Sequence, residues 1–220
     1  MASDDLIRIK DLAFSYQNGK KVFQNLDFSL RKKDRIGLIG PNGAGKTTLF
    51  HLIMGLLRPS AGSIEIFGRV RKSESDFTEV RQKIGLLFQD SDDQLFCPTV
   101  EEDIAFGPLN LGRSHGEAQA LVRELCGQLG LSGYEKRITY RLSGGEKRLV
   151  ALATVMAMRP ECYLFDEPAT GLDEKTTARF LDYLVHHADT YIIITHNREL
   201  LKHTVDRVYT LNGGSLKLLE

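Results

Sequence analysis

The stretch Gly40-Pro-Asn-Gly-Ala-Gly-Lys46-Thr47 fits the pattern GxxxxGK[ST], and the sequence on both sides of it fits as well. Residues 35–40 form an apolar run typical of a buried strand, and residues 46–56 have a helical pattern. Glycines let backbone N–H groups turn inward around phosphate oxygens, and the start of a helix adds a partial positive charge. We therefore predict a phosphate-binding loop between a strand and a helix of an α/β fold.

A loop of this kind predicts a bound nucleotide. Lys46 can reach the β- and γ-phosphates, the Thr47 hydroxyl can ligate Mg²⁺, and Thr48 is expected to add a phosphate contact. The predicted nucleotide-binding residues of this segment are Gly40, Pro41, Asn42, Gly43, Ala44, Gly45, Lys46, Thr47 and Thr48. The alternative is a glycine-rich turn with an incidental lysine, and the agreement between motif and flanks disfavours it.

A second nucleotide element follows at Cys162-Tyr-Leu-Phe-Asp166-Glu167, an apolar strand that ends in two acids. Asp166 is the predicted Mg²⁺ ligand. Glu167 is the predicted catalytic base, because a carboxylate near the γ-phosphate can orient the attacking water or accept its proton. Taken alone, the two acids could equally be a capping or solvated pair after a strand. The phosphate loop makes the catalytic interpretation the better one.

Short apolar segments separated by turn signals predict the strands. These are residues 6–9, 22–30, 35–40, 63–67, 84–88, 162–165, 191–195, 207–211 and 215–219. The predicted helices are residues 46–56, 117–129, 143–158 and 174–188. Early strands joined by turns, then strands alternating with helices, predict an α/β core with an antiparallel β flank.

The composition excludes several classes of protein. Lys plus Arg number 29 and Asp plus Glu number 29, so the net charge gives no long-range attraction to nucleic acid, and no such partner is predicted. Cys97, Cys126 and Cys162 lie far apart without CxxC spacing, which disfavours a disulfide framework or a zinc site. The N-terminus lacks signal-peptide features, and the longest apolar stretch, residues 149–158, is half a membrane span. We expect a chain in the reducing cytosol.

The segment Leu142-Ser-Gly-Gly-Glu146 predicts the start of another helix, with Ser143 and Glu146 as a capping box. The exposed N-terminus of a helix binds anions, yet the core already holds one phosphate loop. Two chains could therefore each cap the nucleotide of the other. An ordinary N-capped helix is the alternative, and so short a motif does not exclude it.

Together, several motifs resemble those of an ATP-binding cassette (ABC) ATPase in order and spacing. They are Gly40–Thr47, Gln89, Leu142–Glu146, Leu164-Phe-Asp-Glu-Pro168, Gly171-Leu-Asp173 and His196. The resemblance implies that Gln89 senses Mg²⁺ and the lytic water, and that His196 touches the γ-phosphate. It also implies that Ser143, Gly144 and Gly145 contact the γ-phosphate held by the opposite subunit. Asp173 would span the dimer interface, and Tyr16 would stack on adenine. For Tyr16 alone, an aromatic side chain of the core or surface without a role in binding is an equally good interpretation.

The fold that this resemblance implies is α/β: a phosphate-loop NTPase core with an antiparallel β flank and an inserted helical subdomain. About 120 residues separate Lys46 from Asp166, enough for such an insertion. We expect a single domain over residues 1–220, with the core at about 1–91 and 159–220 and the helical subdomain at about 92–158. ATP would be the substrate, Mg²⁺ the cofactor, and a second ATPase subunit the partner.

A finer resemblance lies at Leu87–Phe96 and Pro98–Gly112, which look like the ATPase subunit of energy-coupling factor transporters, especially the cobalt and nickel uptake branch. It implies an integral membrane coupling subunit and a substrate-binding membrane subunit as partners, at the cytoplasmic face of the cell membrane. Ser91 departs from the family's usual proline. The chain end soon after residues 215–219 also favours the metal branch.

In that family the segment after the glutamine docks against the membrane partner. The expected docking surface combines the apolar side chains Leu95, Phe96 and Phe106 with acids that would receive a basic helix. These acids are Asp90, Asp92, Asp93, Glu101, Glu102 and Asp103. A solvated acidic loop before a helix capped by Thr99 and Glu102 is the alternative interpretation. The alternative functions are an energy-coupling factor ATPase for a vitamin and a soluble ABC ATPase without a role in transport.

Two substitutions test the assigned chemistry. Glu167→Gln keeps the size of the side chain but removes the base, so hydrolysis is expected to fall by about 10²-fold or more while ATP still binds. Lys46→Ala is expected to weaken nucleotide binding itself. Binding isotherms and steady-state turnover separate the two effects, and wild-type turnover by Glu167→Gln would remove Glu167 from its role.

Overall fold

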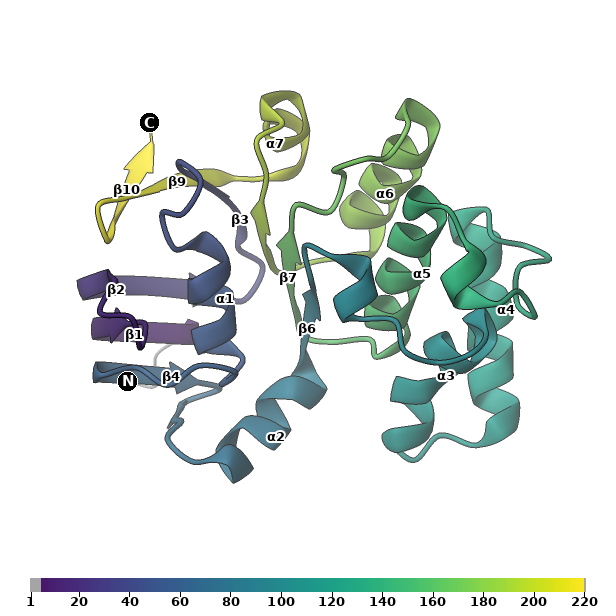
Figure 1. Ribbon diagram of the computed structural model, residues 1–220, viewed down its shortest axis with the longest axis horizontal. Coiled ribbons are helices and arrows are strands. Elements are labelled where there is room, and N and C mark those ends of the chain that lie inside the picture. The colour runs from purple at the N-terminus through teal and green to yellow at the C-terminus, as the bar shows by residue number, and fades with distance from the viewer. Residues whose placement is uncertain (1–4, 220) are drawn as a thin grey trace.

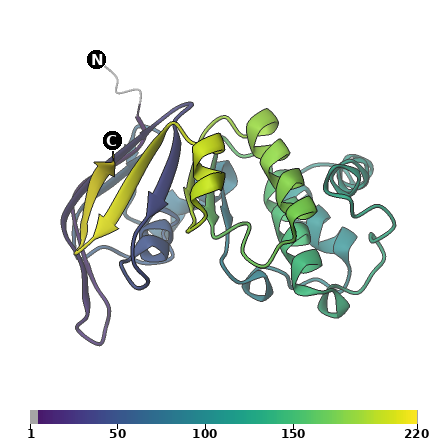
Figure 2. The ribbon, with the colours of Figure 1, turned by 90° about the horizontal axis from the view of Figure 1, so that it is seen from above.

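The computed structural model describes residues 5–219, with strands gathered at one end and helices at the other (Figures 1 and 2). The strands are β1 (Asp5–Ser15), β2 (Lys21–Arg31), β3 (Arg35–Ile39), β4 (Ala61–Ile66), β5 (Arg69–Val70), β6 (Ile84–Leu87), β7 (Cys162–Asp166), β8 (Tyr191–Ile194), β9 (Arg207–Asn212) and β10 (Ser215–Leu219). Residues 1–4 and 220, which the single-domain prediction included, lie outside the described residues.

The α-helices are α1 (Lys46–Ile53), α2 (Glu74–Lys83), α3 (Val100–Asn110), α4 (His115–Leu129), α5 (Gly144–Ala157), α6 (Glu174–His187) and α7 (Arg198–Thr204). Two 3₁₀ turns, η1 (Ser91–Asp93) and η2 (Thr139–Arg141), lie before α3 and α5. Within residues 5–219, none of the helices is long and apolar enough to cross a bilayer.

Two sheets form the core. The antiparallel sheet has the order β2-β1-β4-β5, and the larger sheet has the order β10-β9-β3-β8-β7-β6. In the larger sheet, β9, β3, β8, β7 and β6 run parallel, and β10 closes the edge as an antiparallel hairpin with β9. The prediction of an α/β core with an antiparallel flank is confirmed.

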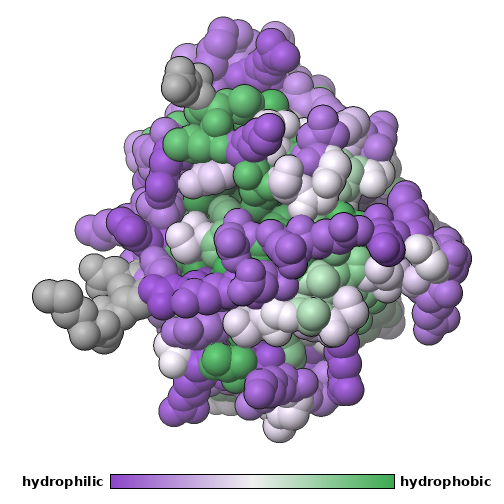
Figure 3. Space-filling view, turned by 90° about the vertical axis from the view of Figure 1, so that its left-hand side faces the viewer, coloured by the Kyte–Doolittle hydropathy of each residue, from purple (hydrophilic) through white to green (hydrophobic). Residues whose placement is uncertain are grey.

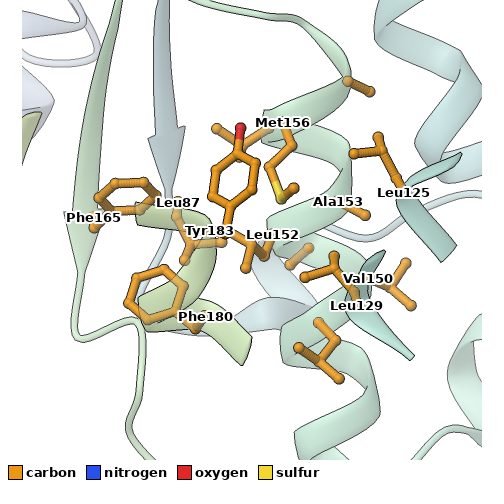
Figure 4. Packing of buried hydrophobic residues seen from close by; sticks show 14 of the residues in the cluster. Leu87, Leu125, Leu129, Val150, Leu152, Ala153, Met156, Phe165, Phe180 and Tyr183 are labelled. Atoms are coloured by element: carbon orange, nitrogen blue, oxygen red, sulfur yellow. The ribbon is translucent and has the colours of Figure 1, made fainter. Parts of the chain in front are cut away.

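Strands β6, β7 and β8 are buried on both faces, because side chains alternate along a strand and other elements cover each side of the sheet. On β7, Cys162 and Leu164 join one apolar cluster with α1 and the antiparallel sheet. Tyr163 and Phe165 join the other cluster, with α5 and α6. Figure 4 shows this second cluster, in which Phe165 faces Phe180 of α6 with ring centroids 5.5 Å apart. The strand that ends at Asp166 is therefore fixed from both sides.

Helices α3, α4 and α5 pack together at the far end from the antiparallel sheet (Figure 1). Their shared core includes Ile104, Val122, Leu125 and Val150, all almost completely buried. The apolar run that looked like half a membrane span is thus the buried face of α5.

Several predicted elements were incomplete. The first strand extends over Asp5–Ser15 rather than 6–9, since charged side chains at its exposed positions hide the pattern. Helices α2 and α7 were not predicted as elements, and α3 was predicted only in the alternative interpretation, as a helix capped by Thr99 and Glu102, which is the capping box observed. Helix α2 buries only Phe77 and Val80, α3 contains Pro108, and α7 has seven residues, so each gives a weak periodic signal.

Candidate nucleotide site

The candidate site lies where four parallel strands end. Gly40 directly follows β3, Glu167 directly follows β7, and Gln89 and His196 each stand two residues beyond β6 and β8. The carboxyl ends of parallel strands meet at one edge of a sheet, which is where open α/β sheets bind ligands. Four segments that are distant in sequence therefore converge.

The phosphate loop has the backbone that its glycines permit. Gly40 and Gly45 have φ of 151° and 105°, and a Cβ at Gly40 would meet Leu211 O at 2.2 Å. The Lys46 ammonium folds into the loop, where it donates to Gly40 O at 2.8 Å and Pro41 O at 3.1 Å. Burial lowers the Lys46 pKa, while Glu167 and Asp166 oppose that shift. The cation is thus held where phosphate oxygens would be received.

Thr47 and Asp166 meet across the site, with the Thr47 hydroxyl donating to Asp166 Oδ2 at 2.6 Å. Asp166 is only 2% exposed, and this burial raises its carboxyl pKa. One hydroxyl and one carboxylate are oxygen donors of the kind that Mg²⁺ prefers, with phosphates and water completing the shell. Among the described residues no group of three or more His, Cys, Asp or Glu could hold a metal, so an all-protein cage is not what residues 5–219 offer.

Glu167 and His196, the two predicted catalytic residues, lie beside each other. His196 Nε2 lies 3.5 Å from Glu167 Oε1, and the Thr170 hydroxyl donates to Glu167 Oε2 at 3.1 Å. Oε1 is buried and has no hydrogen bond, since the histidine contact is too long for one. Glu167 has φ of 49°, a left-handed conformation that costs free energy in a residue other than glycine. An unpaired carboxylate oxygen held in this way is suited to accept a hydrogen bond from water.

Tyr16 and Thr48 are paired with each other. The Tyr16 hydroxyl and Thr48 Oγ1 are 2.8 Å apart, and the Tyr16 ring stands edge-on to Phe14 with centroids 5.0 Å apart. The ring is 38% exposed, beside the helix that follows the phosphate loop. Thr48 was expected to contact phosphate, but it is 6% exposed and its hydroxyl is already engaged.

Gln89 and the glycines of the Ser143 segment line one cavity of about 600 Å³ together with Thr47 and Gly171. Ser143 is the N-cap of α5, and Glu146 Oε2 accepts from Ser143 N at 2.7 Å, as the capping box predicts. Asp173 is the N-cap of α6 and accepts from Thr176 N at 2.7 Å. Both helix starts are exposed on this side of the molecule.

The sequence analysis missed Arg148 and Gln94. Arg148 is 4% exposed, and its guanidinium donates to five backbone carbonyls at the ends of β6 and β7. Gln94 accepts from Phe88 N and donates to Ala151 O, which ties the same segment to α5. The one signal for Arg148 was a cation directly before the apolar run of residues 149–158.

The expected acidic docking surface was wrong for Asp103, which is buried. Asp103 is 3% exposed and accepts from the backbone of Phe96 and Cys97 and from Thr139. Four of the other acids have partners inside the chain: Asp92 pairs with Lys147 at 2.6 Å, Glu101 pairs with Lys136, Glu102 accepts from Thr99, and Asp90 caps η1. Asp90, Asp92, Asp93 and Glu102 are nevertheless exposed, as expected. Leu95 packs against the core. These groups build the turn that leads into α3.

The aromatic part of that surface is present. Phe96 and Phe106 are 67% and 47% exposed, and their rings meet edge-on with centroids 4.8 Å apart. Phe106 also lines a cavity of about 640 Å³ between α3 and α4, with Leu109 and Val122. An exposed pair of phenylalanines beside a hollow is suited to contact with another protein.

Comparison with known proteins agrees with this geometry. The profile described as "ABC transporter" matches residues 23–170. The energy-coupling factor transporter ATP-binding protein EcfA of Methanothermobacter thermautotrophicus is 44% identical over 215 residues, which are 96% of this chain and 69% of that protein.

Solved structures give the same result. The chain is similar to cbiO1 of Clostridium perfringens, described as part of the ABC transporter complex cbiONQ, with a TM-score of 0.84 and 29% identity over 98% of this chain and 88% of the other. It is also similar to the ATP-binding cassette MJ0796, solved as a dimer bound to ADP and phosphate. That match has a TM-score of 0.87 over 97% and 99% of the two chains, and at 22% identity it concerns the fold alone.

The burial of the Asp166 carboxyl leads us to expect that this residue lowers the stability of the folded chain while it serves the site. Its raised pKa means that the folded state favours the protonated form, so the ionised carboxylate opposes folding at pH values above that pKa. Asp166→Asn, which can still accept from Thr47, is expected to raise the free energy of unfolding of the nucleotide-free chain at neutral pH. The gain should shrink as the pH falls and wild-type Asp166 becomes protonated.

Denaturant titrations over a range of pH measure this gain, and ATP turnover should be lost in the same variant if Asp166 is the Mg²⁺ ligand that the sequence predicts. Asp173→Asn is the control, since Asp173 is exposed and its pKa is lowered by the N-cap hydrogen bond from Thr176. A lower stability of Asp166→Asn at neutral pH would contradict the burial argument.

Proposed function

Because the chain belongs to the ABC transporter family, in which ATP hydrolysis is coupled to transport, we propose that it is the ATPase subunit that energises an energy-coupling factor importer. The chain binds ATP and is an ATPase. The observation that carries the proposal is that three features lie at one edge of the parallel sheet. They are the Lys46 ammonium, the hydrogen-bonded pair of Thr47 with Asp166, and the contact of His196 with Glu167. Separate strands supply these groups, so their convergence is a property of the fold and not of one short motif.

The roles of the residues in hydrolysis follow from their positions. Lys46 and the loop N–H groups would bind the phosphates, and Thr47, Asp166 and Gln89 would hold Mg²⁺, which neutralises charge on the transferring group. Glu167 Oε1, buried and without a hydrogen bond, would orient the attacking water and accept its proton. His196, 58% exposed and 3.5 Å from that oxygen, would reach the γ-phosphate from the solvent side. Tyr16 offers a half-exposed ring to adenine.

The proposed assembly is a head-to-tail dimer. Ser143, Gly144 and Gly145 are exposed or half-buried at the N-terminus of α5, where backbone N–H groups and the helix dipole favour an anion. We assign them to the γ-phosphate on the partner subunit, and Asp173 to the interface. The core would comprise residues up to about 91 and from 159, and the helical subdomain about 92–158.

The proposed membrane contact is the aromatic pair Phe96 and Phe106 with the adjoining cavity between α3 and α4. The occupant we propose is a cytoplasmic helix of an integral coupling subunit, and a second membrane subunit would bind the substrate. Asp103 and Asp92 already have partners within the chain, so we assign most of the affinity to apolar contact rather than to charge. The ATPase would then sit peripherally on the cytoplasmic face of the membrane.

The proposed cargo is a cobalt or nickel ion. Support comes from the segment 87–112 and from the likeness to cbiO1, part of the cbiONQ complex. A vitamin importer is the second candidate, because EcfA relatives are named for the transporter class and not for a cargo. The membrane proteins that copurify with the chain after gentle detergent extraction distinguish these candidates from a soluble ABC ATPase without a transport role.

A mixed dimer tests the shared nucleotide site. A dimer of one Lys46→Ala chain and one Ser143→Arg chain has both defects in one composite site and leaves the other site intact, whereas each homodimer has two damaged sites. Mixing is therefore expected to restore nucleotide binding to about one site per dimer. Equilibrium binding of labelled ATP is the readout. Heterodimers that form but bind no more ATP than the homodimers would contradict the head-to-tail arrangement.

Serine substitutions test the membrane contact. Phe96→Ser and Phe106→Ser are each expected to reduce copurification of the membrane subunit at least about tenfold, because buried aromatic anchors dominate interface energies. Basal ATP hydrolysis of the isolated chain should stay within about twofold, since neither ring contacts the nucleotide site.

The matched control is Leu218→Ser, on β10, because Leu218 is 52% exposed, between the values for Phe106 and Phe96. This hairpin is at the opposite end of the molecule from α3 (Figure 1), on a face where hydrophobic and hydrophilic side chains are mixed (Figure 3). If both phenylalanine variants copurified with the membrane subunit as well as the wild type does, the proposed membrane contact would be wrong.

A further inference from the structure

Arg148 is a buried cation without a side-chain acid as its hydrogen-bond partner among the described residues. It lies on α5, and its guanidinium has five N–H groups that all donate to backbone carbonyls. Nη1 contacts Phe88 O and Gln89 O, Nη2 contacts Asp166 O at 2.6 Å and Glu167 O at 2.5 Å, and Nε contacts Pro168 O at 3.1 Å. Leaving any of these carbonyls unpaired would be costly at this depth.

These carbonyls belong to the two segments that carry the reaction. One segment leaves β6 and contains Gln89, and the other leaves β7 and contains Asp166 and Glu167. Arg148 therefore clamps both segments to the helix that begins at the Ser143 cap, a little more than one turn away. Because an α-helix is stiff, a displacement of its first turn moves the guanidinium with it.

Glu167 is the residue most dependent on this clamp. Its backbone has φ of 49°, and such a conformation persists only when its surroundings determine it. Its N–H donates to Ile194 O at 3.0 Å, and its carbonyl accepts from Arg148. Removing the second contact frees the peptide to relax, which turns Oε1 away from its position beside His196.

We infer that Arg148 is a positioning residue that sets the Glu167 carboxylate from helix α5, so that the start of this helix and the general base of the same chain move together. The inference rests on the proposed role of Glu167 as the base. In a head-to-tail dimer, it links the helix start that faces one nucleotide with the base that acts on the other.

Lysine is the informative substitution at this position. Arg148→Lys keeps the positive charge but offers three donors from a single atom, which cannot span the carbonyls of two segments. We expect kcat for ATP hydrolysis to fall on the order of 10²-fold, as a misplaced catalytic group does, while the dissociation constant for ATP stays within about threefold.

Arg71 provides the matched control. Its side chain is 2% exposed and also donates to backbone carbonyls, those of Ile66 and Asp76, but it ties β4 to α2 away from the site. Arg71→Lys should lower the unfolding midpoint and leave kcat nearly unchanged. If Arg148 served only stability, both lysine variants would show the same small change in kcat at temperatures below unfolding.

Two further measurements connect Arg148 to Glu167. In the Glu167→Gln background, adding Arg148→Lys should reduce hydrolysis less than about threefold, because the base on which the arginine acts is already gone. In Arg148→Ala, guanidinium at millimolar, non-denaturing concentration should restore kcat at least about tenfold, whereas ammonium should not, since only the planar fork matches the carbonyls.

Three outcomes would overturn the inference: multiplicative losses in the double variant, a kcat of Arg148→Lys within about threefold of wild type, or failure of both Arg148 variants to fold. All of these measurements use the chain itself, without a membrane partner. A wrong assignment of the importer would leave these results unchanged, and a wrong assignment of Glu167 would appear first as wild-type turnover by Glu167→Gln.

Discussion

Parallel pairing of β3, β8, β7 and β6 is the constraint on which the candidate site depends. Strands that run in one direction place all their carboxyl ends at one edge, so Gly40, Gln89, Glu167 and His196 meet although they span more than half of the chain. The pairing is fixed because both faces of the sheet are buried, one against α1 and the antiparallel sheet and the other against α5 and α6. A register slip would exchange these faces along the strand.

The site itself departs from what stability favours. Asp166 is buried with a raised carboxyl pKa, Glu167 has a left-handed backbone and a buried oxygen without a hydrogen bond, and the Lys46 ammonium is buried with a lowered pKa. Each of these features costs free energy in the chain alone, and each presents a charge to a phosphate, a metal ion or water. The two-sided core around β7 supplies the stability that such an arrangement requires.

Arg148 adds a connection that motifs do not describe. Arg148 donates to backbone carbonyls, so the residues that carry these carbonyls could change identity and the acceptors would still be present. Gln94 and the Asp92–Lys147 pair tie the segment after β6 to α5 in a similar way. Of the acids expected to face a membrane partner, Asp103 is buried in this internal network, whereas Asp90, Asp92, Asp93 and Glu102 are exposed in the same region as Phe96 and Phe106.

The sequence by itself determined the local chemistry: the phosphate loop, the acids after an apolar strand, the capped helix at Ser143 and the alternation of strands and helices. Glycine spacing, capping boxes and apolar runs act over a few residues, so they can be recognised without a fold. Tertiary structure decided which side chains are paired, which is why Asp103 proved to be buried, Thr48 proved to be engaged by Tyr16, and Arg148 went unnoticed. Burial and long-range hydrogen bonds depend on segments that pack from elsewhere in the chain, and no local pattern encodes them.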